Sequence, residues 1–272
     1  MYIDFHTHAF TDAIAERAMG KLADTLLNSD FREKEPPVTN GTVEQLLKVM
    51  DGCGVDKSVL LPIATKPSQQ GTINNWARSV QEQFPDRIIS FGTVHPDAED
   101  VFEELERIKE IGLRGIKFHP DYQDVFADDE KLFPIYRKCA ELGLPVILHA
   151  GFDVVSPDCI HCMPHMGARI IEEIPELTLI LAHLGGCDCW DDVEKYLVGK
   201  NVYFDTAFID GLISDEQALR IFRNHGTDKI LFASDCPWHS PSREKAMLER
   251  LPLTEEERED ISHRNAEKLL GI

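Results

Sequence analysis

Two histidines near the start of the chain and three polar residues far from them have the types and spacing of a metal-dependent active site. His6 and His8 are two residues apart, so on a β-strand both side chains would share one face, about 6 to 7 Å apart, and could bind one ion. His149 and Asp235 could add a third nitrogen and a carboxylate oxygen, which are ligands that Zn²⁺ accepts. A bound zinc ion lowers the pKa of water to about 7, and a nearby histidine such as His183 could polarise the substrate or protonate a leaving group.

These residues can meet only if the chain between them folds back to one place. Eight short, mostly apolar runs bounded by Gly, Pro, His or Asp are typical of strands buried on both faces of a parallel sheet. They are Tyr2–Phe5, Lys57–Pro62, Ile88–Val94, Leu113–Phe118, Pro145–Leu148, Leu177–Ala182, Val202–Asp205 and Lys229–Ala233. Helical periodicity lies between them, with Gly112 and Gly143 as expected helix ends and Thr42 and Thr254 as expected helix starts.

Eight strands alternating with helices over 272 residues predict an α/β fold with one (β/α)₈ barrel domain, residues 1–272. A doubly wound open sheet is the alternative, but no G-x-G-x-x-G motif follows any expected strand. Barrel active sites lie at the carboxyl ends of the strands. His6 and His8 follow the first strand, and His149, His183 and Asp235 follow the fifth, sixth and eighth, so the barrel would gather all five at one mouth.

Five motifs in a fixed order carry a resemblance to a known family. They are Asp4-Phe5-His6-Thr7-His8, Gly115-Ile116-Lys117-Phe118-His119-Pro120, Leu148-His149-Ala150-Gly151, Ala182-His183-Leu184-Gly185-Gly186 and Ala233-Ser234-Asp235. The chain resembles the amidohydrolase superfamily, and within it the amidohydrolase 2 branch with its aminocarboxymuconate-semialdehyde-decarboxylase-like enzymes. The resemblance implies a distorted barrel with one divalent metal ion, usually zinc, bound by His6, His8, His149 and Asp235. It implies His183 as the catalytic acid/base and a second, proton-accepting role for Asp235.

Lys117 and His119 share one face at the end of the fourth expected strand. We favour a role in binding a substrate carboxylate. Related amidohydrolases hold a second metal ion on a carboxylated lysine in this strand, so Lys117 could serve in that way instead, and a structural role is the third interpretation.

Cysteines gather after the fifth and sixth expected strands, at Cys159–His165 and at Cys187–Cys189. This ligand chemistry could form a structural zinc site. The spacings match no common zinc motif, so we favour reduced thiols that line the substrate pocket.

The expected function is hydrolysis of an amide, lactone or ester bond in a small organic substrate by a metal-activated water. The alternative is a metal-dependent, non-oxidative decarboxylase (a lyase) of the same branch, because the metal ligands do not separate the two. Arginine suits a substrate carboxylate, and none stands at a strand end, which disfavours the decarboxylase. Two further hypotheses are less favoured: a non-catalytic barrel that only binds a metal ion or ligand, and a nuclease of similar barrel type.

Composition limits the partners. The chain is 43% apolar, which excludes a disordered protein, and its formal charge of −20 opposes nucleic acid and anionic membranes. Seven cysteines and an N-terminus without a targeting signal predict reduced thiols and a cytoplasmic location. We therefore expect a small-molecule substrate and leave a homodimer open.

Overall fold

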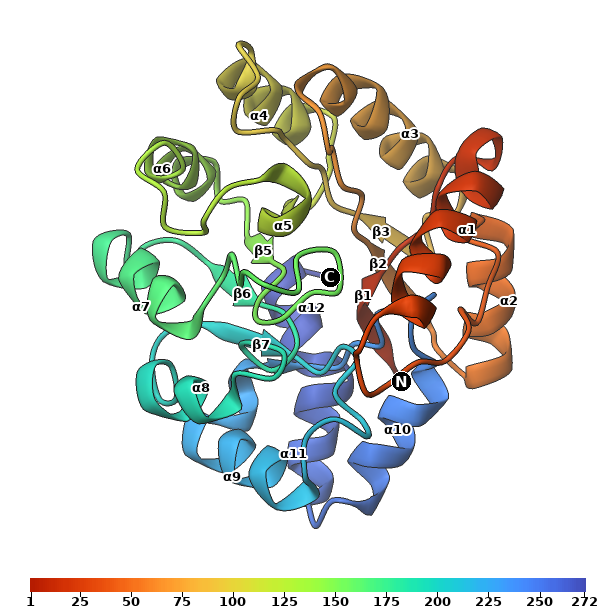
Figure 1. Ribbon diagram of the computed structural model, residues 1–272, viewed down its shortest axis with the longest axis vertical. Helices are drawn as coiled ribbons and strands as arrows, with labels where there is room; N and C mark the ends of the chain where they lie inside the picture. The colour runs from red at the N-terminus through yellow and green to blue at the C-terminus, as the bar shows by residue number, and fades with distance from the viewer.

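Eight short parallel strands form the centre of the computed structural model, which describes all residues 1–272. The strands are β1 (Ile3–Thr7), β2 (Lys57–Leu60), β3 (Ile88–Ser90), β4 (Ile116–Phe118), β5 (Val146–Leu148), β6 (Leu179–Leu181), β7 (Tyr203–Asp205) and β8 (Ile230–Leu231). The α-helices are α1 (Asp12–Asn28), α2 (Val43–Cys53), α3 (Gln70–Gln83), α4 (Val101–Glu110), α5 (Pro120–Gln123), α6 (Phe133–Leu142), α7 (Pro164–Glu173), α8 (Trp190–Tyr196), α9 (Asp215–His225), α10 (Pro241–Arg250), α11 (Glu255–Glu259) and α12 (Asn265–Leu270). Figure 1 shows most of the helices as an outer ring around the strands, with α12 near the centre of the view.

The strands pair in sequence order as two sheets, β1-β2-β3 and β4-β5-β6-β7-β8, and backbone hydrogen bonds cross both seams. At one seam, Lys117 N–H donates to the carbonyl of Gly92 over 2.8 Å. At the other seam, Phe5 N–H donates to the carbonyl of Phe232, also over 2.8 Å, and the Ser234 hydroxyl donates to the Asp4 carboxylate over 2.6 Å. The ring therefore closes as a distorted barrel, which confirms the predicted fold.

Each predicted strand is present, and most are shorter than expected. Within the run Ile88–Val94 only β3 and an isolated bridge at Gly92 are β-structure, and within Leu177–Ala182 only β6. The residues that follow leave the sheet to build the barrel mouth. The helix signals also agree with the structure, because Gly143 ends α6 at φ 63° and the Thr42 hydroxyl accepts from Gln45 N–H at the start of α2.

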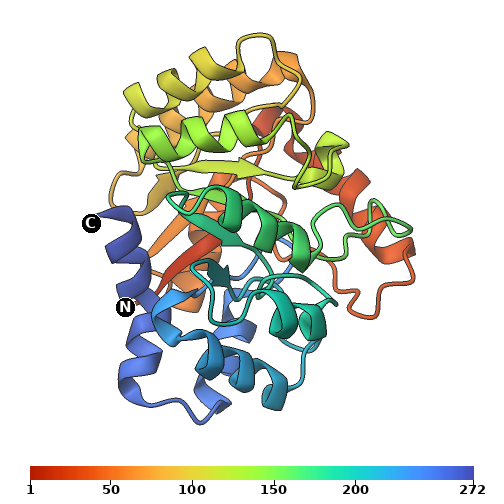
Figure 2. The ribbon, with the colours of Figure 1, turned by 90° about the vertical axis from the view of Figure 1, so that its left-hand side faces the viewer.

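Side chains fill the inside of the barrel. Phe5 and Phe91 meet edge to face with ring centroids 5.7 Å apart, and Ile147, Ile180 and other aliphatic side chains surround them. Leu270 of α12 joins this cluster near the end where the strands begin. Figure 2 shows both termini at that end, whereas α1 and the loop after β5 lie at the other. A substrate must therefore bind at the mouth where the strands end. No helix combines the length and the apolar character needed to cross a bilayer.

The buried residue His225 lies at the end of α9, remote from the mouth of the barrel. It makes the free energy of unfolding depend on pH. Its Nε2 donates to the carbonyl of Val202 over 2.8 Å, and its Nδ1 accepts from Gly199 N–H over 3.2 Å. Both contacts suit the neutral ring, and burial lowers the pKa of His225 from 6.5 to about 4. His225 of the unfolded chain takes up a proton below about pH 6.5, whereas His225 of the folded chain does so only near pH 4. The contribution of the neutral ring to the free energy of unfolding is therefore fully present above about pH 6.5 and is lost as the pH falls toward about 4.

We expect His225 to cost the folded state about 2 kcal/mol between pH 7 and pH 5, because each unit of pKa difference contributes about 1.4 kcal/mol. Urea unfolding of the wild type and of His225→Gln at the two pH values measures this difference. Glutamine cannot take up the proton, so the variant should lose less stability over the same interval. An equal loss in both proteins would contradict the assignment.

Candidate metal centre and its pocket

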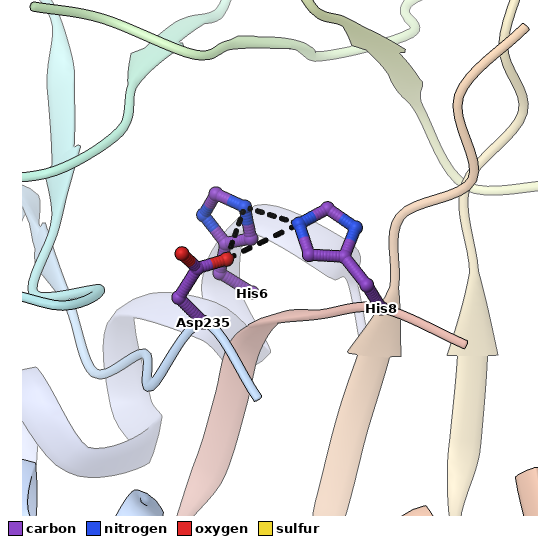
Figure 3. Close-up of side chains that lie close together, drawn as sticks. All are labelled: His6, His8 and Asp235. Atoms are coloured by element: carbon purple, nitrogen blue, oxygen red, sulfur yellow. Dashed lines mark hydrogen bonds and ion pairs between the residues drawn. The ribbon is translucent and has the colours of Figure 1, made fainter. Parts of the chain in front are cut away.

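The first and last strands bring His6, His8 and Asp235 together, and we call these three residues the triad. His6 and His8 lie at the end of β1 and just beyond it, and Asp235 N–H donates to the carbonyl of His6 over 2.9 Å. The two Nε2 atoms are 3.0 Å apart, and Asp235 Oδ1 lies 3.4 Å from His6 Nε2 and 3.2 Å from His8 Nε2. Figure 3 shows the three side chains converging on one point.

Hydrogen bonds on the far side of each ring fix which nitrogen faces that point. His8 Nδ1 donates to the carbonyl of Leu61 over 2.8 Å, and His6 Nδ1 donates to Asp205 Oδ2 over 2.8 Å. Each Nε2 therefore presents a lone pair to the other and to the Asp235 carboxylate. Such an outer acceptor is the usual partner of a histidine that binds metal.

The donor set of the triad fits a divalent metal ion. Ligand atoms at about 2.0–2.1 Å from a tetrahedral ion are about 3.3 Å apart, close to the separations in the triad. Burial lowers the pKa of His6 well below its ordinary value, which keeps the ring neutral as a ligand must be. Lys117 Nζ lies 3.2 Å from His6 Nε2, and burial lowers the pKa of this amine to about 8.

His149 lies in a different group, formed with His119 and Asp153, which we call the second cluster. The two imidazole rings are stacked with centroids 4.3 Å apart. Asp153 Oδ2 lies 3.4 Å from His119 Nε2 and 3.5 Å from His149 Nε2. The structure thus brings together three of the four predicted ligands, and binding of the triad's ion by His149 stays a prediction.

His183 lies between the triad and the second cluster. Its ring centroid is 5.5 Å from that of His6, and its Nε2 is 3.0 Å from His149 Nδ1. Its Nδ1 donates to the carbonyl of Ala207 over 2.8 Å, and its backbone N–H donates to Asp205 Oδ1 over 2.8 Å. This position suits the predicted acid/base role, which no contact here tests.

A cavity opens above these groups, and its walls are mainly apolar. The side chains that line it are Leu22, Leu26, Phe31, Tyr122, His149, Phe152, Asp153, Val154, Val155, His183, Cys187, Phe208, Asp235 and Trp238. Phe31, from the connection between α1 and α2, stacks on Phe152 at 5.4 Å. No lysine or arginine side chain lines the cavity, and His119 does not line it either. The role of Lys117 and His119 in binding a substrate therefore stays a prediction.

The cysteine-rich loops do not form a metal cluster. All seven cysteines are free thiols, and neither group of converging ligand atoms contains one. His161 instead pairs with Asp121 over 2.9 Å. The structure therefore favours the interpretation of these cysteines as reduced thiols, and Cys187 lies on the pocket wall.

Sequence reasoning missed Asp205 and Asp153. Asp205 is the last residue of the seventh expected strand, and the histidines were found just after the ends of other strands, so a polar strand end was an available signal. Asp153 lies in the irregular loop after β5, where no periodicity marks it.

Comparison with known proteins gives one curated relative and many similar structures. The relative, a 2-amino-3-carboxymuconate-6-semialdehyde decarboxylase from Dictyostelium discoideum, is 24% identical over 200 residues, which cover 61% of this chain and 55% of that protein. An uncharacterized TIM-barrel protein from Bordetella bronchiseptica is similar with a TM-score of 0.78, at 18% identity over 99% of this chain and 98% of its own. A 5-carboxyvanillate decarboxylase from Novosphingobium aromaticivorans with bound manganese has a TM-score of 0.75, at 18% identity over 100% and 97% of the two chains.

The expectation of a hydrolase is wrong in the light of these relatives, because those with a stated reaction are mostly decarboxylases. The lack of an arginine at a strand end had weighed mildly against decarboxylation, since arginine is the usual partner of a substrate carboxylate. A divalent metal ion can bind and polarise a carboxylate itself, so the missing arginine was no test of the reaction.

The family follows from a match that runs along nearly the whole chain. The amidohydrolase family model matches residues 3–272. This range includes every strand and all residues of the triad and of the second cluster. The chain therefore belongs to the amidohydrolase family.

Proposed function

We propose that this protein is a metal-dependent, non-oxidative decarboxylase of a planar organic acid. The observation that carries the proposal is the position of Asp235, the carboxylate of the triad, beside His149 and His183 on the wall of a cavity that is otherwise mainly aromatic and aliphatic. Such a cavity suits an unsaturated or aromatic ring with its carboxylate directed to the triad. The decarboxylases among the relatives support this reaction class.

His6, His8 and Asp235 would hold the ion, with His149 as the predicted fourth ligand. A divalent ion supplies Lewis acidity and a fixed positive charge toward a carboxylate. Zinc is the ion we propose to test first, because imidazole nitrogen suits it, and the manganese in the Novosphingobium neighbour makes Mn²⁺ its competitor.

The side chains of the pocket have three tasks in the reaction. The apolar walls orient the ring and exclude water, which favours loss of a charged carboxylate as neutral CO₂. When the carbon–carbon bond breaks, its electron pair stays on the substrate carbon, and a proton must take the place of CO₂. Asp235 and His183 both line the pocket, and we propose them as the groups that hold and deliver this proton.

Release of CO₂ tests the proposal. Protein loaded with Zn²⁺ or Mn²⁺ is incubated with hydroxybenzoate-type and muconate-type acids, and CO₂ is measured together with the decarboxylated product. We expect turnover of at least one acid. Turnover of an ester or lactone panel with no CO₂ from any acid would overturn the proposal.

The pocket also predicts a preference for acids with a single carboxylate. A second carboxylate would be buried without a cation, beside Asp153 and Asp235, which is costly. We expect kcat/KM to be at least tenfold higher for an acid with an apolar substituent than for its dicarboxylate analogue. Leu22→Arg, which places a cation on the wall formed by α1, should narrow the ratio, whereas Leu22→Met should not. An unchanged ratio in Leu22→Arg would contradict this account.

A further inference from the structure

The irregular segment between α1 and α2 forms part of the pocket wall, and we call its residues 29–38 the strap. Phe31 is the only buried side chain of the strap. Its ring packs against Phe152 and Phe208, with centroid distances of 5.4 Å and 6.0 Å. Residues 32–37 belong to no helix or strand and make no backbone–backbone hydrogen bond. The backbone of the strap therefore does not by itself fix the position of Phe31.

Two sets of ion pairs hold the strap instead. Arg243 contacts Glu33 over 2.6 Å and Glu35 over 3.1 Å. Arg32 pairs with Asp188, in the loop after β6. The Arg32 side chain is 57% exposed, so water and salt screen its pair, whereas the Glu33 side chain is only 20% exposed and that of Arg243 only 27%. The pair of Glu33 with Arg243 is therefore the stronger restraint on the strap.

Arg243 belongs to a packed unit made of α10 and the loop after β7. Its Nε lies 3.2 Å from Asp210 Oδ2, in the loop that also carries Phe208. Glu244, the next residue of α10, is fully buried and accepts from the backbone N–H groups of Ile209 and Asp210, both over 3.2 Å. Buried hydrogen bonds thus fix this loop to α10, and Arg243 joins the strap to both.

The glycine that follows Asp210 shows how closely the pair of Glu33 with Arg243 lies against this loop. A Cβ at Gly211 would be 2.8 Å from Nη2 of Arg243 and 3.3 Å from Oε2 of Glu33. Both distances are shorter than an ordinary van der Waals contact, so the pair occupies the space that a side chain at this position would need. The two charged groups are packed against the protein on this side rather than surrounded by water.

We propose that Arg243 is a positioning residue, which through Glu33 holds the strap, and with it Phe31, against the pocket. Phe31 then completes the apolar wall on which a planar ring would rest. The inference rests on the proposed binding of a planar acid in this pocket. It involves none of the metal ligands, and Arg243 itself does not line the cavity.

Limited proteolysis with trypsin tests whether Arg243 holds the strap. The exposed residue Lys34 offers a cleavage site there, and cleavage of a folded protein reports how often the segment opens. We expect cleavage after Lys34 to be about fivefold faster or more in Arg243→Met than in the wild type. Arg250→Met is the matched control, because Arg250 also pairs with Asp210 from α10, over 2.5 Å, and has no ion pair with the strap. Its cleavage rate should equal that of the wild type.

Binding of two acids tests whether the strap shapes the place of the ring. Zinc-loaded wild type, Glu33→Gln, Arg243→Met and the double variant are titrated by calorimetry with benzoate and with acetate, which has a carboxylate but no ring. We expect each single variant to bind benzoate about tenfold more weakly and acetate equally well. The double variant should also lose about tenfold, because both substitutions remove the same contact. Glu33→Gln nearly keeps the size of its side chain, so it decides the question if Arg243→Met fails to fold.

Three results would overturn the inference. The first is equal cleavage of Arg243→Met and the wild type, and the second is equally fast cleavage of Arg250→Met and Arg243→Met. The third is a loss of benzoate affinity of about a hundredfold in the double variant, since Arg243 would then act without Glu33. If the wild type binds benzoate and the variants behave as expected, but no acid releases CO₂, the proposed function fails and the inference stands.

Discussion

Asp235→Asn should lower kcat by about a thousandfold or more, equivalent to about 4 kcal/mol of activation free energy, and should leave the fold intact. The carboxylate is the only anionic member of the triad and the group that we propose to exchange a proton with the substrate carbon. Asparagine removes both the charge and the basicity at constant size. It also tolerates the left-handed backbone at this position, where φ is 67°. Steady-state CO₂ release with the preferred acid measures the effect.

The exposed carboxylate of Asp86 provides a matched control for this variant. Asp86→Asn makes the same chemical change at a site remote from the mouth and should leave kcat unchanged. A loss of less than tenfold in Asp235→Asn, with the metal content unchanged, would remove Asp235 from the catalytic role.

Gly151→Ala should destabilise the fold by about 3 kcal/mol or more. Gly151 has φ 85°, and a Cβ placed there would lie 2.0 Å from the backbone nitrogen of Cys187 and 2.3 Å from its carbonyl oxygen. Both atoms take part in the backbone hydrogen bonds that join the loop after β5 to the loop after β6. In these bonds Cys187 N–H donates to the carbonyl of Ala150, and Phe152 N–H donates to the carbonyl of Cys187. No side-chain rotation can relieve such a contact, so the two loops must separate.

Denaturant unfolding measures this effect, with Gly20→Ala as the control. Gly20 lies in α1 with nothing within 4 Å of its Cβ position, so alanine there should stabilise the helix by about 0.5–1 kcal/mol. A loss below 1 kcal/mol in Gly151→Ala would show that the loops after β5 and β6 can separate without strain.

The sequence was most informative where a residue type and a regular element coincide. Strand periodicity together with polar strand ends predicted the barrel and the positions of His6, His8, His183 and Asp235, because the carboxyl ends of parallel strands must meet. It was uninformative for groups whose position depends on loop conformation. Asp153 and Phe31 reach the pocket from irregular segments, and the direction of the His149 ring depends on a hydrogen bond to His183 that no spacing encodes.

The closure of the barrel also sets the order in which the site can form during translation. Asp4 and Ser234 are hydrogen-bonded across the seam although they are 230 residues apart. At about 5–20 residues per second, the ribosome adds the last strand roughly 10 to 50 s after the first. During that interval β1 has its partner β2 on one side and an open edge on the other, and His6 and His8 face no carboxylate of Asp235. Under the proposed assignment of the metal ligands, capture of an ion by the complete triad must therefore await synthesis of the end of the chain.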